Sequence, residues 1–155
     1  MSSEGLAWLD VWRKAKEFAL LVYKEGLSKL PPEEKWGLGQ QIRRAAQSIP
    51  ANIAEGYGRY YYQETIRFCY IARGSLEETL SHLVLAFELG YLPELSYQSL
   101  INSGDNVAKL INGYIAYLKR SRQGANEPGS PASMHEQDGN YDAIFAPEEI
   151  EDGEE

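Results

Sequence analysis

The strongest constraint on the fold is an apolar seam with helical spacing in residues 63–89. An α-helix turns once in 3.6 residues, so side chains that recur at alternating steps of three and four lie on one face. The stretch therefore predicts a long helix from about residue 63 to residue 89 that packs along one side. The members of the seam are Ile66, Cys69, Arg73, Leu76, Leu80, Leu83 and Phe87.

Three other stretches repeat this rhythm, and no stretch alternates as a strand would. Prolines and glycines near residues 31, 57 and 92 separate the four stretches by short connections, which favour antiparallel neighbours. Pro50 lies inside the second stretch and should kink it. The sequence thus predicts an all-α fold, an antiparallel up-down four-helix bundle. Its other helices should cover residues 6–28, with Trp8 on the apolar face, 33–54 and 94–120.

Charge divides the chain into two parts. All 15 basic residues lie in residues 1–122, which carry 13 acidic residues and a net charge of +2. Residues 123–155 hold the other 10 acidic residues, no basic one, and too few apolar residues to form a core. We therefore predict a bundle domain over residues 1–122 and a disordered acidic tail over residues 123–155.

Groups that support catalysis or metal binding are scarce. His82 and His135 have no second ligand at metal-binding spacing, and Cys69 on the apolar seam is typical of a buried thiol. The sequence shows neither a phosphate-binding glycine loop nor a signal peptide nor an apolar run of membrane length. These features predict a cytoplasmic protein that is not an enzyme, with no catalytic residue, metal or cofactor.

Arg73 is the charged member of the apolar seam. Because an unpaired charge in the interior is very unfavourable, we expect a carboxylate partner. Glu77 lies four residues on and shares its helix face, and Glu55 could reach it from the preceding helix. These residues favour a structural ion pair, and an exposed, ligand-binding arginine is the alternative.

Two basic clusters are candidate nucleic-acid contacts. Arginines bind phosphates, and tyrosine rings stack on unpaired bases, which contributes ~1–3 kcal/mol per base. Each cluster has a structural alternative, because tyrosines also pack against neighbouring helices or subunits and one of two adjacent arginines can pair inward. The candidates are Arg43 and Arg44 in the second predicted helix, and Arg59, Tyr60, Tyr61 and Arg67 after it.

Seven short motifs lie between residues 8 and 120. They are DVWRKA (10–15), EKWGL (34–38), QIRRAA (41–46), SIPANIAEG (48–56), RF (67–68), IARGSL (71–76) and ELGYL (88–92). Together they resemble the four-helix-bundle family encoded in intervening sequences of bacterial 23S ribosomal RNA genes. That family is similar in fold to the accessory variability protein of diversity-generating retroelements, a pentameric barrel that assists a reverse transcriptase.

The resemblance implies a ring-like homo-oligomer, with a pentamer as one form, and association with nucleic acid but no catalysis. Two departures stand out. The family usually has small polar or basic residues where this chain has three tyrosines (60–62), and the acidic tail exceeds the usual family chain.

Two functions follow as hypotheses. The first is RNA binding by basic and aromatic residues repeated around a homo-oligomer. The second is a scaffold that docks a partner enzyme such as a reverse transcriptase through exposed aromatic residues. The tail could be a solvated segment, or a polyanion that competes with nucleic acid for the basic surface.

Overall fold

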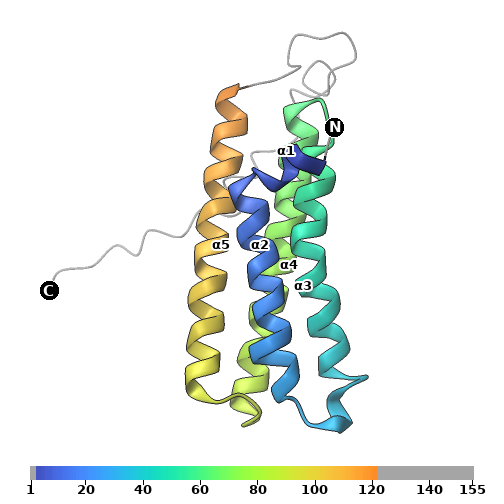
Figure 1. The fold of residues 1–155 in the computed structure, drawn as a ribbon, viewed down its shortest axis with the longest axis vertical. Helices are drawn as coiled ribbons and strands as arrows, with labels where there is room; N and C mark the ends of the chain where they lie inside the picture. Colours follow the sequence, from blue (N-terminus) through green and yellow to red (C-terminus); the bar gives the residue numbers. More distant parts are fainter. Residues whose placement is uncertain (1–2, 122–155) are drawn as a thin grey trace, which may run out of the picture.

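The structure is a computed structural model that describes residues 3–121, and within that range it is helical with no strand. The predicted all-α class is confirmed. The long helices α2, α3, α4 and α5 lie side by side, and successive ones run in opposite directions (Figure 1). The predicted disordered tail and the domain boundary at residue 122 lie outside the described residues. The helices are α1 (Ser3–Ala7), α2 (Asp10–Leu21), α3 (Leu38–Tyr57), α4 (Tyr62–Glu88) and α5 (Glu94–Ser121).

The core runs along the centre of the four long helices. Each of these helices contacts the next one along the chain, α2 also contacts α5, and α3 and α4 share the most extensive contact. The seam of α4 lines this core, because Ile66, Cys69, Leu76 and Leu83 are buried, and Leu80 and Phe87 pack against them. None of the described helices is long and apolar enough to cross a lipid bilayer.

The first predicted helix is broken. Leu9 has extended backbone angles, which separates α1 from α2, and α2 passes into a π-helical turn (Val22–Gly26) and a 3-10 turn (Leu27–Lys29). The prediction that Trp8 lies on the apolar face is wrong, because this residue is 82% exposed. The break at Leu9 turns Trp8 away from the face that Val11 and Phe18 bury.

The second predicted helix begins five residues later than expected. Residues Pro32–Glu34 form a 3-10 turn, and α3 starts at Leu38. Glu34 nevertheless stabilises the start of α3, because its Oε2 accepts a hydrogen bond from the Leu38 N–H at 3.0 Å. α3 continues through Pro50, where the kink stays a prediction, and Gly58 follows its last residue.

Cys69 lies in the core and is 1% exposed, which confirms the predicted buried thiol. Burial raises the pKa of this thiol from 9.0 to about 12, since the thiolate would lose its hydration. Burial also raises the pKa of the Tyr114 hydroxyl.

We expect the free energy of unfolding to fall as the pH rises above about 9. The unfolded chain releases the Cys69 proton there, whereas the folded chain keeps it until about pH 12, so stability present below pH 9 is lost across that interval. Urea unfolding at several pH values between about 8 and 11 measures the loss. Cys69→Ala should reduce the slope of the unfolding free energy against pH. An unchanged slope would exclude the thiol as the source of the pH dependence.

Candidate nucleic-acid interface

The connection between α3 and α4 brings four of the six predicted contact residues to one end of the bundle. α3 ends at Tyr57 and α4 begins at Tyr62, so Arg59, Tyr60 and Tyr61 fall in the connection, with Arg67 in the second turn of α4. The start of α2 and the end of α5 lie at the same end (Figure 1). We call residues 5–13, 54–67 and 114–121 together the α3–α4 end.

The charge of Arg59 is partly neutralised by Glu55 in the last turn of α3. Its Nη2 lies 3.3 Å from Oε1 of Glu55, and its guanidinium carbon lies 5.1 Å from the centroid of the Phe68 ring. The two charged side chains are 43% and 57% exposed, and exposed pairs of this kind contribute at most about 1 kcal/mol. A phosphate could therefore replace Glu55 as the partner of Arg59 at little cost.

Tyr60 presents an aromatic ring to solvent and is 54% exposed. Its ring meets that of Tyr61 edge to face, with centroids 5.2 Å apart and planes at 81°. Tyr61 is half-buried, and its carbonyl accepts the Thr65 N–H at 3.2 Å, which fixes the backbone where α4 begins. The pair thus has one ring that can stack on a base and one that supports it.

Arg67 is exposed and makes no ion pair with any residue of the described range 5–121. It lies near the N-terminus of α4, where Tyr61 provides no side-chain cap and the helix dipole favours an anion. Arg120, in the last turn of α5, is likewise exposed at this end. Of the two arginines among the candidates at this end, Arg67 therefore has fewer competing partners than Arg59.

Arg43 and Arg44 do not join this cluster. Arg44 is exposed, but Arg59 lies fifteen positions further along the chain, which corresponds to roughly 20 Å along the bundle. Nη2 of Arg43 donates to the Lys35 carbonyl at 2.7 Å, which ties its guanidinium to the α2–α3 connection. The six predicted contacts thus form two separate sites, and Arg43 has a structural contact in one of them.

Arg73 is half-buried rather than interior. Nη1 of Arg73 donates to Oδ1 of Asn112 on α5 at 2.9 Å, and its guanidinium lies 4.8 Å from the centroid of the Tyr70 ring. Because solvent reaches the half-buried guanidinium of Arg73, its charge stays partly hydrated and does not require a carboxylate. The predicted pairing of Arg73 with Glu77 or Glu55 stays a prediction, and Glu55 already pairs with Arg59.

The motif in residues 48–56 has packing roles that the sequence did not reveal. The Ser48 and Ser75 hydroxyl oxygens lie 2.8 Å apart, and Nδ2 of Asn52 donates to the Ser48 hydroxyl and carbonyl at 2.8 and 2.7 Å. The Ser48–Ser75 contact forms a polar bridge between α3 and α4, and Asn52 supports Ser48 from within α3. The spacing of Ser48 and Asn52, four residues apart on one helix face, is the signal that could have indicated it.

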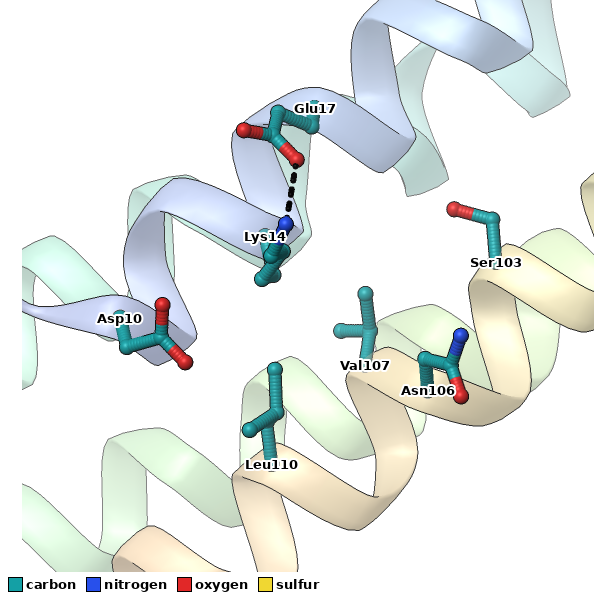
Figure 2. A pocket seen from close by; sticks show the side chains of 7 residues that line it. All are labelled: Asp10, Lys14, Glu17, Ser103, Asn106, Val107 and Leu110. Carbon is teal, nitrogen blue, oxygen red and sulfur yellow. Dashed lines mark hydrogen bonds and ion pairs between the residues drawn. The ribbon is translucent and has the colours of Figure 1, made fainter.

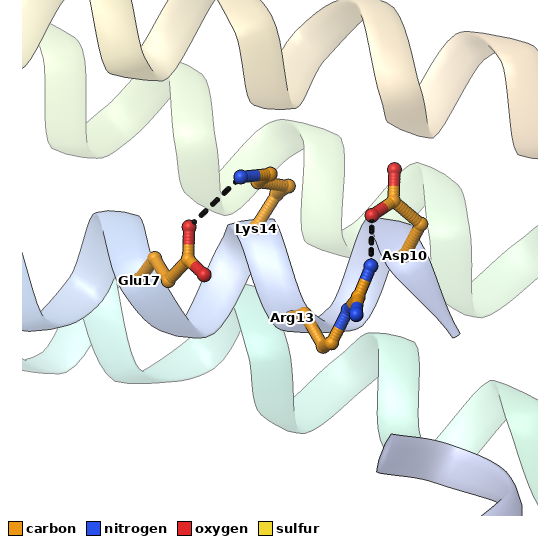
Figure 3. A network of polar contacts seen from close by, with 4 residues as sticks. All are labelled: Asp10, Arg13, Lys14 and Glu17. Atoms are coloured by element: carbon orange, nitrogen blue, oxygen red, sulfur yellow. Dashed lines mark hydrogen bonds and ion pairs between the residues drawn. The ribbon is translucent and has the colours of Figure 1, made fainter. Parts of the chain in front are cut away.

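A polar groove of about 530 Å³ runs between α2 and α5 (Figure 2). The cation that lines it, Lys14, is already paired, with its Nζ 3.2 Å from Glu17, and the lining carboxylate of Asp10 pairs with Arg13 Nη2 at 2.5 Å (Figure 3). The groove therefore does not favour a phosphate. No group of three or more potential metal ligands occurs in the described range. The lining residues are Asp10, Lys14, Glu17, Ser103, Asn106, Val107 and Leu110.

Comparisons with known proteins agree with the motifs. The sequence model of a family described as 23S rRNA-intervening sequence protein matches residues 8–113. A solved structure is similar at 30% identity and a TM-score of 0.61, over 68% of this chain and 97% of its own: a protein of unknown function from the S23 ribosomal protein family of Bacteroides thetaiotaomicron. No curated protein matches. The chain belongs to the 23S rRNA-intervening sequence protein family.

Proposed function

We propose that this protein is a non-enzymatic, homo-oligomeric up-down four-helix bundle that binds structured RNA through the α3–α4 end. The observation that carries the proposal is the exposed Tyr60 ring between Arg59 and Arg67. A flat ring flanked by cations suits unpaired bases and their phosphates, which RNA displays in loops and bulges. The family name refers to sequences that interrupt 23S rRNA genes, which makes a 23S rRNA hairpin the first RNA to test.

Oligomerisation would strengthen RNA binding, because once one site has bound, the other sites of the assembly meet the same RNA at a high effective concentration.

The outer face of α4 is suited to a contact between subunits. Ile71 and Leu85 lie fourteen residues, or about four turns, apart on this face and are 42% and 47% exposed. Gly74 lies between them with no atom within 4 Å of the position that a Cβ would take, which leaves room for a neighbouring helix.

Arg67→Gln in the full-length chain should weaken binding to an RNA hairpin several-fold at low salt. Each lost phosphate contact lowers the slope of log affinity against log salt by about 0.7–0.9. Tyr60→Ala should weaken binding without changing that slope, because a stacked ring releases no counterions. Fluorescence anisotropy over a salt series measures both quantities, with native mass spectrometry of the same samples for subunit number.

Lys24→Gln is the matched control, since Lys24 is an exposed cation at the opposite end of the bundle. It removes the same charge and should leave affinity within a factor of about two if binding is confined to the α3–α4 end. Equal losses for Arg67→Gln and Lys24→Gln would contradict a localised site. Glu55→Gln should have the opposite sign and tighten binding, because it releases Arg59.

Docking of a partner protein is the second candidate. Trp8 and Trp36 are 82% and 73% exposed, and tryptophan is enriched among the residues that anchor protein interfaces. A well-formed oligomer that does not bind the hairpin at low salt would favour this function, with a reverse transcriptase as the first partner to test.

A further inference from the structure

We propose that the acidic segment 123–155 binds back onto the α3–α4 end of its own bundle. The contact itself depends only on the charges and geometry below. Its consequence, competition with RNA for the same cations, rests on the proposed function.

The position of the end of α5 places the acidic segment beside these cations. α5 ends at Ser121, at the same end as the α3–α4 connection (Figure 1). Residues 122–155 number 34, and a coil of that length has a root-mean-square span of roughly 30 Å. α5 has 28 residues and is roughly 42 Å long. The segment therefore reaches the α3–α4 end far more readily than the opposite end.

Charge within the described bundle is distributed unevenly between its two ends. We call residues 22–38 and 86–97 the opposite end. The α3–α4 end carries five cations and three acids, and the opposite end carries three cations and five acids. A segment with 10 acidic residues is thus attracted by one end only. The α3–α4 end has Arg13, Arg59, Arg67, Lys119 and Arg120 with Asp10, Glu55 and Glu64; the opposite end has Lys24, Lys29 and Lys35 with Glu25, Glu33, Glu34, Glu88 and Glu94.

The strength of the contact comes from the tether rather than from any single pair. An exposed ion pair contributes at most about 1 kcal/mol, but covalent attachment keeps the acidic residues near the bundle at a high effective concentration. Salt screens such pairs beyond a Debye length of about 8 Å under physiological conditions. The contact should therefore be strongest at low salt. An RNA, which has a higher charge density than the acidic segment, should displace it.

Paramagnetic NMR on the full-length chain tests the contact without RNA. Ser133→Cys provides a spin-label site, and native Cys69 is buried and does not compete for the reagent. The matched control has the same length and label, with the ten acids of residues 123–155 replaced by Gln or Asn. We expect amides of residues 59–67 to broaden more in the acidic chain than in the control. The excess should disappear at roughly 0.5 M salt.

Equal broadening in the two chains would overturn the proposal. The double variant Arg67→Gln with Arg120→Gln, in the labelled acidic chain, must also reduce the excess, and an unchanged excess would place the segment elsewhere.

An RNA titration of the same two chains separates the two proposals. The neutralised chain should bind the hairpin about 3–10-fold more tightly at low salt. If the acidic chain shows excess broadening but neither chain binds RNA, the intramolecular contact is supported and the RNA-binding function is contradicted. If both chains bind RNA equally and show no excess broadening, the RNA-binding function is supported and the intramolecular contact is contradicted.

Discussion

Gly56→Ala should lower the free energy of unfolding by about 3 kcal/mol, at the upper end of the usual cost of overpacking. A Cβ at Gly56 would lie 2.7 Å from the Phe68 Cβ and 3.1 Å from the Thr65 carbonyl oxygen. Both atoms are part of, or bonded to, the α4 backbone, so relief requires α3 and α4 to separate. Urea unfolding at fixed protein concentration measures the change, and for a chain of this size it corresponds to a fall in Tm of roughly 10 °C.

Gly113→Ala is the matched control for this prediction. Gly113 lies inside α5 with no atom beyond its own helical turn within 4 Å of the position that a methyl group would take, so the same substitution meets no clash in the bundle. Alanine is favoured over glycine in a helix by about 0.5–1 kcal/mol, and the variant should be more stable by that amount. If both variants shifted stability in the same direction, the close contact at Gly56 would not be the cause.

Phe18→Ala should cost about 3–5 kcal/mol, the range for removing a buried aromatic ring. Phe18 is 0% exposed, and its Cε2 and Cζ lie 3.4 Å from the position that a Cβ on Gly104 would take. The absence of a side chain at Gly104 thus lets α5 approach the ring closely. The cavity left by alanine is lined by packed helices, which cannot collapse fully to fill it.

The measurement is again urea unfolding, with an unchanged m value as evidence that the variant unfolds in the same way. Phe18→Leu keeps most of the apolar volume and should lose less stability than Phe18→Ala. A loss below about 1 kcal/mol for Phe18→Ala would contradict the central position of this ring.

The sequence predicted the long helices well because burial of their apolar faces dominates the pattern. α4 and α5 begin and end within about one residue of the predicted limits. Gly90 takes the expected left-handed conformation after α4, with φ of 82°. The errors in the predicted helix limits lie at Leu9 and at the start of α3. At such positions an extended residue ends a helix without changing the apolar spacing, so the periodicity does not reveal the break.

The candidate site was predicted less well. Spacing identifies which residues share a helix face, so Arg67 was correctly expected outside the α4 seam. It does not give the distance between positions along the bundle, so it could not show that the two predicted basic clusters lie roughly 20 Å apart. It also does not give partners across the bundle, such as Asn112 for Arg73.

The polar bridge at Ser48 and the close approach at Gly56 together fix how α3 and α4 can move. Sliding one helix along the other by a turn would part the two serine hydroxyls and push a larger α3 side chain against Phe68. Shear between these helices is therefore disfavoured, and we expect the pair to move as one unit. A ligand that pulls on residues 58–61 should accordingly tilt α3 and α4 together.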